Sequence, residues 1–258
     1  MKRTILAMTA ALVAAFAVAA DAPKAKRGRP KGCNPSGGIV EKAYAGNVIR
    51  AFNAQALIPA DKVASLTLQM RYETIVPFET VGAKSMTFAE AENAAAGFVG
   101  KDKAGAAVVI VNDPSKRDFY RASPEGRWAV LNVSPLKADN PAQERLEERF
   151  AKVYWHAVVR ALGGGYAAVK PSVMTPFSDL KTLDAIPTTK PSPDVVNMLI
   201  DTGSLYGIRT ITIASYRTAC RNGWAPPPTN DVQRTIWNQV HQIPDKPITI
   251  EFDPKKDK

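Results

Sequence analysis

Apolar residues form two kinds of segment that follow one another along the chain. One kind is a short continuous run, and the other repeats with helical spacing. Runs rich in β-branched and aromatic residues predict strands, and three- and four-residue repeats predict helices. Strands are expected at Val48–Asn53, Thr74–Val81, Ala106–Val111, Trp128–Val133, Gly207–Ser215 and, at an edge, Ile248–Phe252. Helices are expected from Pro59 to Met70 and at Phe88–Phe98, Asp194–Thr202 and Asp231–His241. This order predicts an α/β (α+β) fold with a mixed, mostly parallel sheet covered by helices.

The clearest helical pattern runs from Asn140 to Leu162. Asn140 would cap this helix, Pro141 would open it, and Gly163–Gly165 would end it. Its apolar face, which we expect to be buried, consists of Leu146, Phe150, Val153, Tyr154, Ala157, Val158 and Ala161. A second stripe, which points away from that face, carries Arg145, Arg149, Lys152, His156 and Arg160. We expect it to face solvent, either as a plain basic surface or as a groove for an anionic ligand.

The N-terminus has the pattern of a secretory signal peptide. Lys2 and Arg3 precede an uncharged run, Ile5–Ala20, that ends in small residues. A membrane anchor is the alternative, but the run is short and rich in alanine for a span. Removing residues 1–20 leaves a formal charge of +8 instead of +10. We therefore expect an exported, basic protein in the periplasm or outside the cell, with no transmembrane segment after cleavage.

The chain has two cysteines, which excludes a disulfide scaffold. An oxidising compartment would allow Cys33 and Cys220 to pair, and two free thiols are the alternative. We divide the rest into a basic disordered arm at 21–45, a main domain at 46–218 and a C-terminal extension at 219–258. The arm is rich in Pro, Gly, Ser and Lys, which cannot form a core.

A short segment of the arm, KRGRPKG at Lys26–Gly32, resembles an AT-hook. AT-hooks bind the minor groove of A·T-rich DNA, so the resemblance implies a core of Arg27, Gly28, Arg29 and Pro30. A single copy placed directly after a signal peptide argues against a chromosomal role. We therefore favour a basic linker and do not expect DNA to be the partner.

The end of the long helix reads HAVVRALGGGY from His156 to Tyr166. In the zinc-peptidase string H-E-x-x-H-x-x-G-x-x-H, three histidines bind zinc and the glutamate is the general base. This chain has His156 at the first ligand and Gly163 at the turn, and Met174 lies where such enzymes have a methionine turn. Over residues 48–195 the spacing resembles the archaemetzincin family of metzincins, which implies a metzincin-like fold.

The chain departs from that family at the positions that carry the chemistry. Ala157 replaces the general base, Arg160 replaces the second histidine, and Tyr166 stands at the third ligand. A guanidinium stays protonated and cannot bind zinc. The family's further cysteines correspond here to Ala167, Ser172, Ser192 and Val195. The resemblance therefore implies a degenerate member without peptidase chemistry and without a cofactor.

We expect a pseudo-peptidase that binds a peptide or another anionic ligand in the family's active-site cleft. Its ligand contacts would be Arg149, His156, Arg160 and Tyr166, with His156 as a donor and the arginines as charge partners. Two alternatives stay open. One is a secreted zinc metallopeptidase with atypical ligands, which would use His156, Tyr166 and a distant residue such as His241. The other is nucleic-acid binding through the arm.

Overall fold

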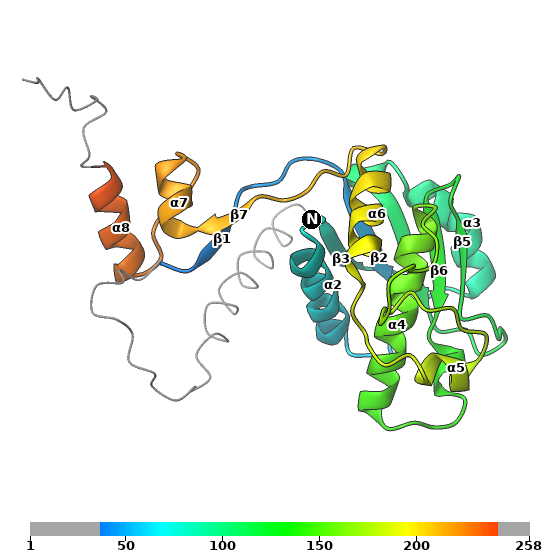
Figure 1. Ribbon diagram of the computed structural model, residues 1–258. Coiled ribbons are helices and arrows are strands. Elements are labelled where there is room, and N and C mark those ends of the chain that lie inside the picture. Colours follow the sequence, from blue (N-terminus) through cyan, green and yellow to red (C-terminus); the bar gives the residue numbers. More distant parts are fainter. Residues whose placement is uncertain (1–36, 242–258) are drawn as a thin grey trace, which may run out of the picture. The chain divides into compact units, whose positions relative to one another are not determined.

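The computed structural model describes residues 37–241 (Figure 1). The expected signal peptide, the AT-hook-like segment, Cys33 and the strand expected at Ile248–Phe252 lie outside the described residues. Between residues 37 and 241, no helix has the length and apolar character needed to cross a membrane.

A five-stranded sheet in the order β3-β2-β4-β6-β5 forms the centre of the main body. Its strands are β2 (Val48–Asn53), β3 (Phe78–Gly82), β4 (Ala104–Val111), β5 (Tyr120–Ser123) and β6 (Trp128–Asn132). Neighbouring strands are parallel from β3 to β6, and β5 pairs antiparallel with β6 at one edge. The expected α+β fold with a mixed, mostly parallel sheet is therefore confirmed.

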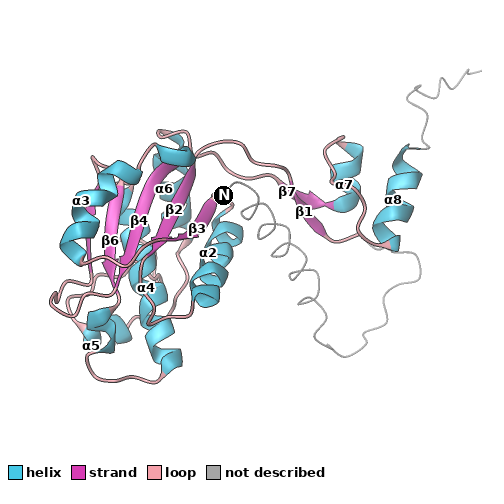
Figure 2. Cartoon of the chain, turned by 180° about the vertical axis from the view of Figure 1, so that it is seen from behind, coloured by secondary structure: helices cyan, strands magenta, loops and turns pink. Residues whose placement is uncertain are grey.

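Helices cover both faces of this sheet (Figure 2). Every residue of β4 is buried, as expected of a central parallel strand. Helices α2 (Ala60–Thr74) and α4 (Gln143–Ala161) share a core with Val108 and Ile110 of β4. Helix α3 (Phe88–Phe98) packs on the other face against Val109 and Val111. Helices α5 (Leu180–Asp184) and α6 (Pro193–Ser204) join the larger core through Leu183 and Val195.

The ends of α4 show where the sequence prediction was right and where it was wrong. The helix starts at Gln143 after an N-cap at Ala142, whereas Asn140 has a left-handed φ of 49° and is not the cap. Gly163, with a φ of 82°, follows the helix as expected, because this conformation costs glycine little. The seven residues of the expected apolar face are all buried.

The C-terminal part of the described chain has a small core of its own. Strand β1 (Ile39–Glu41) pairs antiparallel with β7 (Ile213–Ser215), and α7 (Tyr216–Arg221) and α8 (Asp231–His241) follow. Tyr216, Cys220 and Ile236 are its buried residues. Residues 39–41 are thus a strand, although they belong to the range 21–45 that we expected to be disordered. Only residues 213–215 of the strand expected at Gly207–Ser215 form one. Because Cys33 is not described, its pairing with Cys220 stays a prediction.

Helix α3 begins with a capping box. Thr87 Oγ1 accepts a hydrogen bond from the Glu90 backbone N–H at 3.2 Å, and the Glu90 carboxylate accepts one from the Thr87 N–H at 2.7 Å. Replacing Thr87 with alanine should lower the free energy of unfolding by about 1 kcal/mol, because one end of the helix loses its cap. Thr87→Ser keeps the hydroxyl and should keep the stability. Urea denaturation followed by circular dichroism measures both, and equal stability of Thr87→Ala and wild type would contradict the role of the cap.

Candidate functional site on helix α4

The polar stripe of α4 is covered by the segment Val173–Asp184. Arg149 bonds to Asp184, Lys152 Nζ lies 3.4 Å from the Leu183 carbonyl oxygen, and His156 bonds to Val173. Arg149, Lys152 and His156 are 3 %, 0 % and 0 % exposed. The expectation that this stripe faces solvent is therefore wrong for these three residues. A helical pattern shows which residues share a face, but it does not show that a later segment packs on that face.

Arg149 uses its whole hydrogen-bonding capacity inside the protein. A guanidinium has five N–H donors. Arg149 donates through Nε and Nη2 to the Asp184 carboxylate, at 2.8 and 2.6 Å. It also donates to the Asp139 carboxylate, at 2.6 and 2.8 Å, and to the Leu136 carbonyl oxygen at 2.9 Å. No donor is left for a ligand, so the structure gives Arg149 a structural position instead of the ligand contact expected from the sequence.

His156 is buried in an aromatic environment. Its Nε2 lies 2.9 Å from the Val173 carbonyl oxygen, which can only accept, so Nε2 carries the proton. The ring packs edge-on against Phe177, with centroids 4.8 Å apart, and lies 6.1 Å from the rings of Tyr120 and Tyr166. Burial lowers the pKa of His156 to about 4, and the charge of Arg160 adds to this effect. The ring is therefore neutral near pH 7, and its Nδ1 has no hydrogen-bond partner among the described residues.

Arg160 and Tyr166 lie together beyond the end of the covered stripe. Arg160 Nη1 donates to the Gly164 carbonyl oxygen at 3.0 Å, and its Cζ lies 5.6 Å from the centroid of the Tyr166 ring. Tyr166 is 49 % exposed. Of the four expected ligand contacts, the structure thus brings His156, Arg160 and Tyr166 together, and it places Arg149 apart from them, two helical turns away on α4.

Tyr120 belongs to the same group but was missed in the sequence. It lies on β5, whose four residues YRAS show neither a continuous apolar run nor a clear alternation, so the strand itself was not predicted. Burial raises the pKa of Tyr120, Tyr166 raises it further, and the Arg160 guanidinium lowers it. The Tyr120 ring lies 6.1 Å from the His156 ring, as the Tyr166 ring does, so both phenols belong to the group around His156.

The residues at the expected ligand positions do not fit zinc. Nε2 of His156 carries a proton that is bonded to the Val173 carbonyl oxygen, so the buried Nδ1 is the one ring nitrogen with a lone pair for a metal. Arg160 places a permanent cation beside that ring, and Tyr166 stacks on it. Within residues 37–241, no group of three or more His, Cys, Asp or Glu is placed to hold a metal. Of the alternative ligand set, the structure brings together His156 and Tyr166, with the Arg160 cation beside them.

Two of the positions that correspond to the family's further cysteines meet in the structure. Ser172 Oγ accepts hydrogen bonds from the backbone N–H groups of Met174 and Ser192, at 3.3 and 3.2 Å. Both serines are buried. A hydroxyl that accepts backbone N–H bonds joins the two segments here, which gives the serines a structural role.

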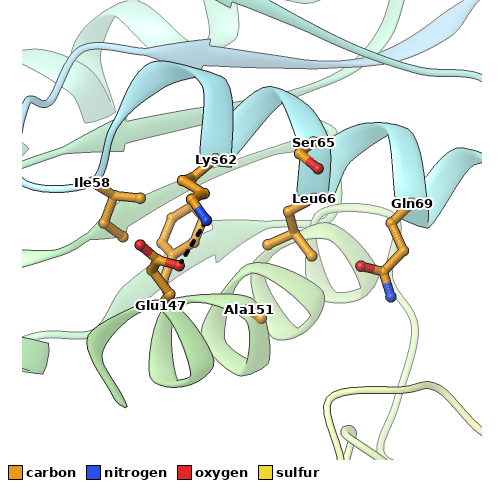
Figure 3. A pocket seen from close by; sticks show the side chains of 8 residues that line it. Ile58, Lys62, Ser65, Leu66, Gln69, Glu147 and Ala151 are labelled. Carbon is orange, nitrogen blue, oxygen red and sulfur yellow. Dashed lines mark ion pairs between the residues drawn. The ribbon is translucent and has the colours of Figure 1, made fainter. Parts of the chain in front are cut away.

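A cavity of about 180 Å³ lies between helices α2 and α4 (Figure 3). Leu66 and Phe150 line its apolar part, and an ion pair of 3.8 Å joins Lys62 to Glu147 at its side. None of the residues expected to bind a ligand lines this cavity.

Comparison with known proteins finds similar structures but no sequence relative. No family model matches the chain, and no curated protein matches it. The structure is similar to archaemetzincin from Methanopyrus kandleri, with a TM-score of 0.47 and 18 % identity over 60 % of this chain and 95 % of that one. It is also similar to a zinc-dependent peptidase from Methanocorpusculum labreanum, with a TM-score of 0.47 and 12 % identity over 58 % of this chain and 99 % of that one. Zinc dependence is a property of that peptidase, and the likeness does not transfer it to this chain.

The Asp184 contacts predict acid sensitivity. Hydrogen bonds from Arg149 hold the pKa of Asp184 down at about 2, below an unfolded value of roughly 3.9. A lowered pKa stabilises the fold above the unfolded value, and the stabilisation is lost as the pH falls through the folded value. Asp184→Asn should therefore cost about 2 kcal/mol near neutral pH. The difference from wild type should shrink between roughly pH 4 and pH 2. Urea denaturation across that range measures it, and a constant difference would contradict the ion-pair argument.

The lowered pKa of His156 predicts a second effect of pH on the stability of the fold, at higher pH than the effect of Asp184. Its folded pKa of about 4 lies below an unfolded value of roughly 6.5. Its stabilising contribution is thus complete above the unfolded value and is lost as the pH falls through the folded value. Relative to His156→Gln, which keeps an N–H donor but does not titrate, wild type should lose about 3 kcal/mol between roughly pH 7 and pH 4. Denaturation curves of the two proteins measure this, with His241→Gln as a control that leaves the buried ring in place. Parallel pH profiles of wild type and His156→Gln would refute the burial of a neutral ring.

Proposed function

We propose that this chain is an exported, non-catalytic protein that binds an extended peptide along strand β5, beside His156, Arg160 and Tyr166. The observation that carries the proposal is the edge position of β5 next to this group. An edge strand presents unpaired backbone N–H and C=O groups, and an extended peptide can add to it as a further strand.

The direction of these groups follows from the pairing of β5 with β6. The Asn132 N–H donates to the Phe119 carbonyl oxygen at 2.9 Å, so the backbone of Phe119 faces β6. Backbone direction alternates along a strand, so Arg121 also faces β6, whereas Tyr120 and Ala122 face the open edge. The outward groups of Tyr120 and Ala122 are therefore the hydrogen-bonding positions for a peptide.

The non-catalytic part of the proposal rests on the same helix. Peptide hydrolysis needs an activated water and a general base. Ala157 stands where the resemblance to zinc peptidases would require the glutamate. His156 is neutral near pH 7, and its Nε2 proton is bonded to Val173. A pKa of about 4 makes His156 a weak base near pH 7, and Arg160 adds a cation where the resemblance would require a second metal ligand.

Export is proposed on the sequence pattern. Lys2, Arg3 and the uncharged run Ile5–Ala20 support a cleaved signal peptide. An exported chain with a formal charge of +8 would meet peptides and other proteins in the periplasm or outside the cell.

The test removes the outward donor of β5. In Ala122→Pro the lost N–H faces the open edge, so the ladder to β6 keeps its bonds. Ala122→Val keeps the N–H and is the matched control. Binding of a fluorescein-labelled library of extended peptides, followed by fluorescence polarisation, should weaken at least about tenfold in Ala122→Pro and stay near wild type in Ala122→Val. Circular dichroism verifies that both variants fold.

Two outcomes would contradict the proposal. Equal binding by both Ala122 variants would show that peptides do not add to β5. About one zinc ion per purified chain, lost in His156→Ala together with hydrolysis of the same peptides, would instead support the secreted metallopeptidase.

A further inference from the structure

Arg160 differs from every other basic residue on the polar stripe of α4, because each of the others pairs with a carboxylate. Arg149 uses all five donors, and Lys152 is buried against Glu148, with 2.6 Å between Nζ and the carboxylate. Arg145 pairs with Asp184 at 2.9 Å. Arg160 makes one hydrogen bond, to the Gly164 carbonyl oxygen, and no carboxylate among the described residues pairs with it.

Two tyrosines, Tyr120 and Tyr166, lie near the Arg160 guanidinium. The Tyr166 ring lies 5.6 Å from Arg160 Cζ, and the rings of Tyr120 and Tyr166 each lie 6.1 Å from the His156 ring between them. Tyr166 is 49 % exposed and Tyr120 is half-buried, and no hydrogen bond within the described residues engages either phenol. Arg160, Tyr120 and Tyr166 therefore present several N–H and O–H donors at one place, and none of the three side chains is negatively charged near neutral pH.

The group stands directly at the edge of β5. Tyr120 is itself a strand residue, and its backbone faces the open edge. Its side chain lies on the α4 face of the sheet, where its ring is 6.1 Å from His156. A peptide added to β5 would place every second side chain on that face. One of these side chains, or the end of the peptide, would come next to Arg160.

The charge of the group favours a carboxylate. One guanidinium matches one monoanion, and its planar fork binds the two oxygens of a carboxylate side by side. His156 is neutral, so it adds no second cation for a dianionic phosphate. The contact between Arg160 and the Tyr166 ring and the hydrogen bond to Gly164 restrain the guanidinium before binding, which reduces the entropy lost on binding.

We propose that Arg160, Tyr120 and Tyr166 form a carboxylate-binding subsite that selects acidic peptides at the edge of β5. This inference rests on the proposed function, since the peptide must first lie along the strand. The carboxylate belongs either to an Asp or Glu side chain or to the C-terminus of the peptide.

The experiment uses a matched set of fluorescein-labelled peptides of one sequence. They carry Asp or Asn at a central position, each with a free or an amidated C-terminus. The full mature chain should bind the peptide with the preferred carboxylate about tenfold more tightly than its neutral counterpart, as expected of a hydrogen-bonded charge pair. Preference for Asp over Asn assigns the subsite to a side chain, and preference for the free over the amidated end assigns it to the C-terminus.

Arg160→Gln supplies the decisive comparison. This variant should bind the neutral peptides as wild type does and should lose the carboxylate preference. Arg145→Gln, which removes the same charge from the same helix, should keep the preference. A preference that persists in Arg160→Gln, or a wild-type protein that binds all the peptides equally, overturns the subsite and leaves strand addition intact. Failure of every peptide to bind wild type overturns the proposed function itself.

Discussion

The burial of charged side chains on α4 is the constraint on which the rest of this structure depends. A buried guanidinium is tolerated only when its donors are paired, because an unpaired charge in the interior costs several kcal/mol. Arg149 meets this condition with two carboxylates and a carbonyl, and these partners come from the turn before α4 and from α5. The position of α5, and with it the course of the segment Val173–Asp184, is thereby tied to one side chain.

The same segment decides what is left for a ligand. It covers about two turns of the polar stripe, where Arg149, Lys152 and His156 each bond to it. Only the last turn, with Arg160, extends beyond it. The residues that the sequence predicts to contact a ligand thus divide into two kinds. Arg149 and His156 are part of the interior packing, whereas Arg160 and Tyr166 remain accessible beside the β5 edge.

The sequence predicted the apolar architecture well, because apolar periodicity is a local property. Strand β2 and helices α3 and α8 have the expected bounds, and the apolar face of α4 is buried as expected. The prediction failed where burial depends on distant partners. Arg149 was expected to face a ligand, since the sequence does not show that Asp184, 35 residues later, packs against it. Strand β5 was missed for a related reason: its four residues become a strand only by pairing with β6.

The hydrogen bonds between α4 and the segment Val173–Asp184 also affect how the protein withstands proteases. Long connections between helices are common sites of cleavage, because a protease needs a stretch of chain that can open locally. Here the connection between α4 and α6 is held at Val173, Leu183 and Asp184 by side chains of a helix that is itself in the core. Local opening would have to break an ion pair with a buried arginine. The buried side chains of α4 therefore protect the connection between α4 and α6 from proteolysis.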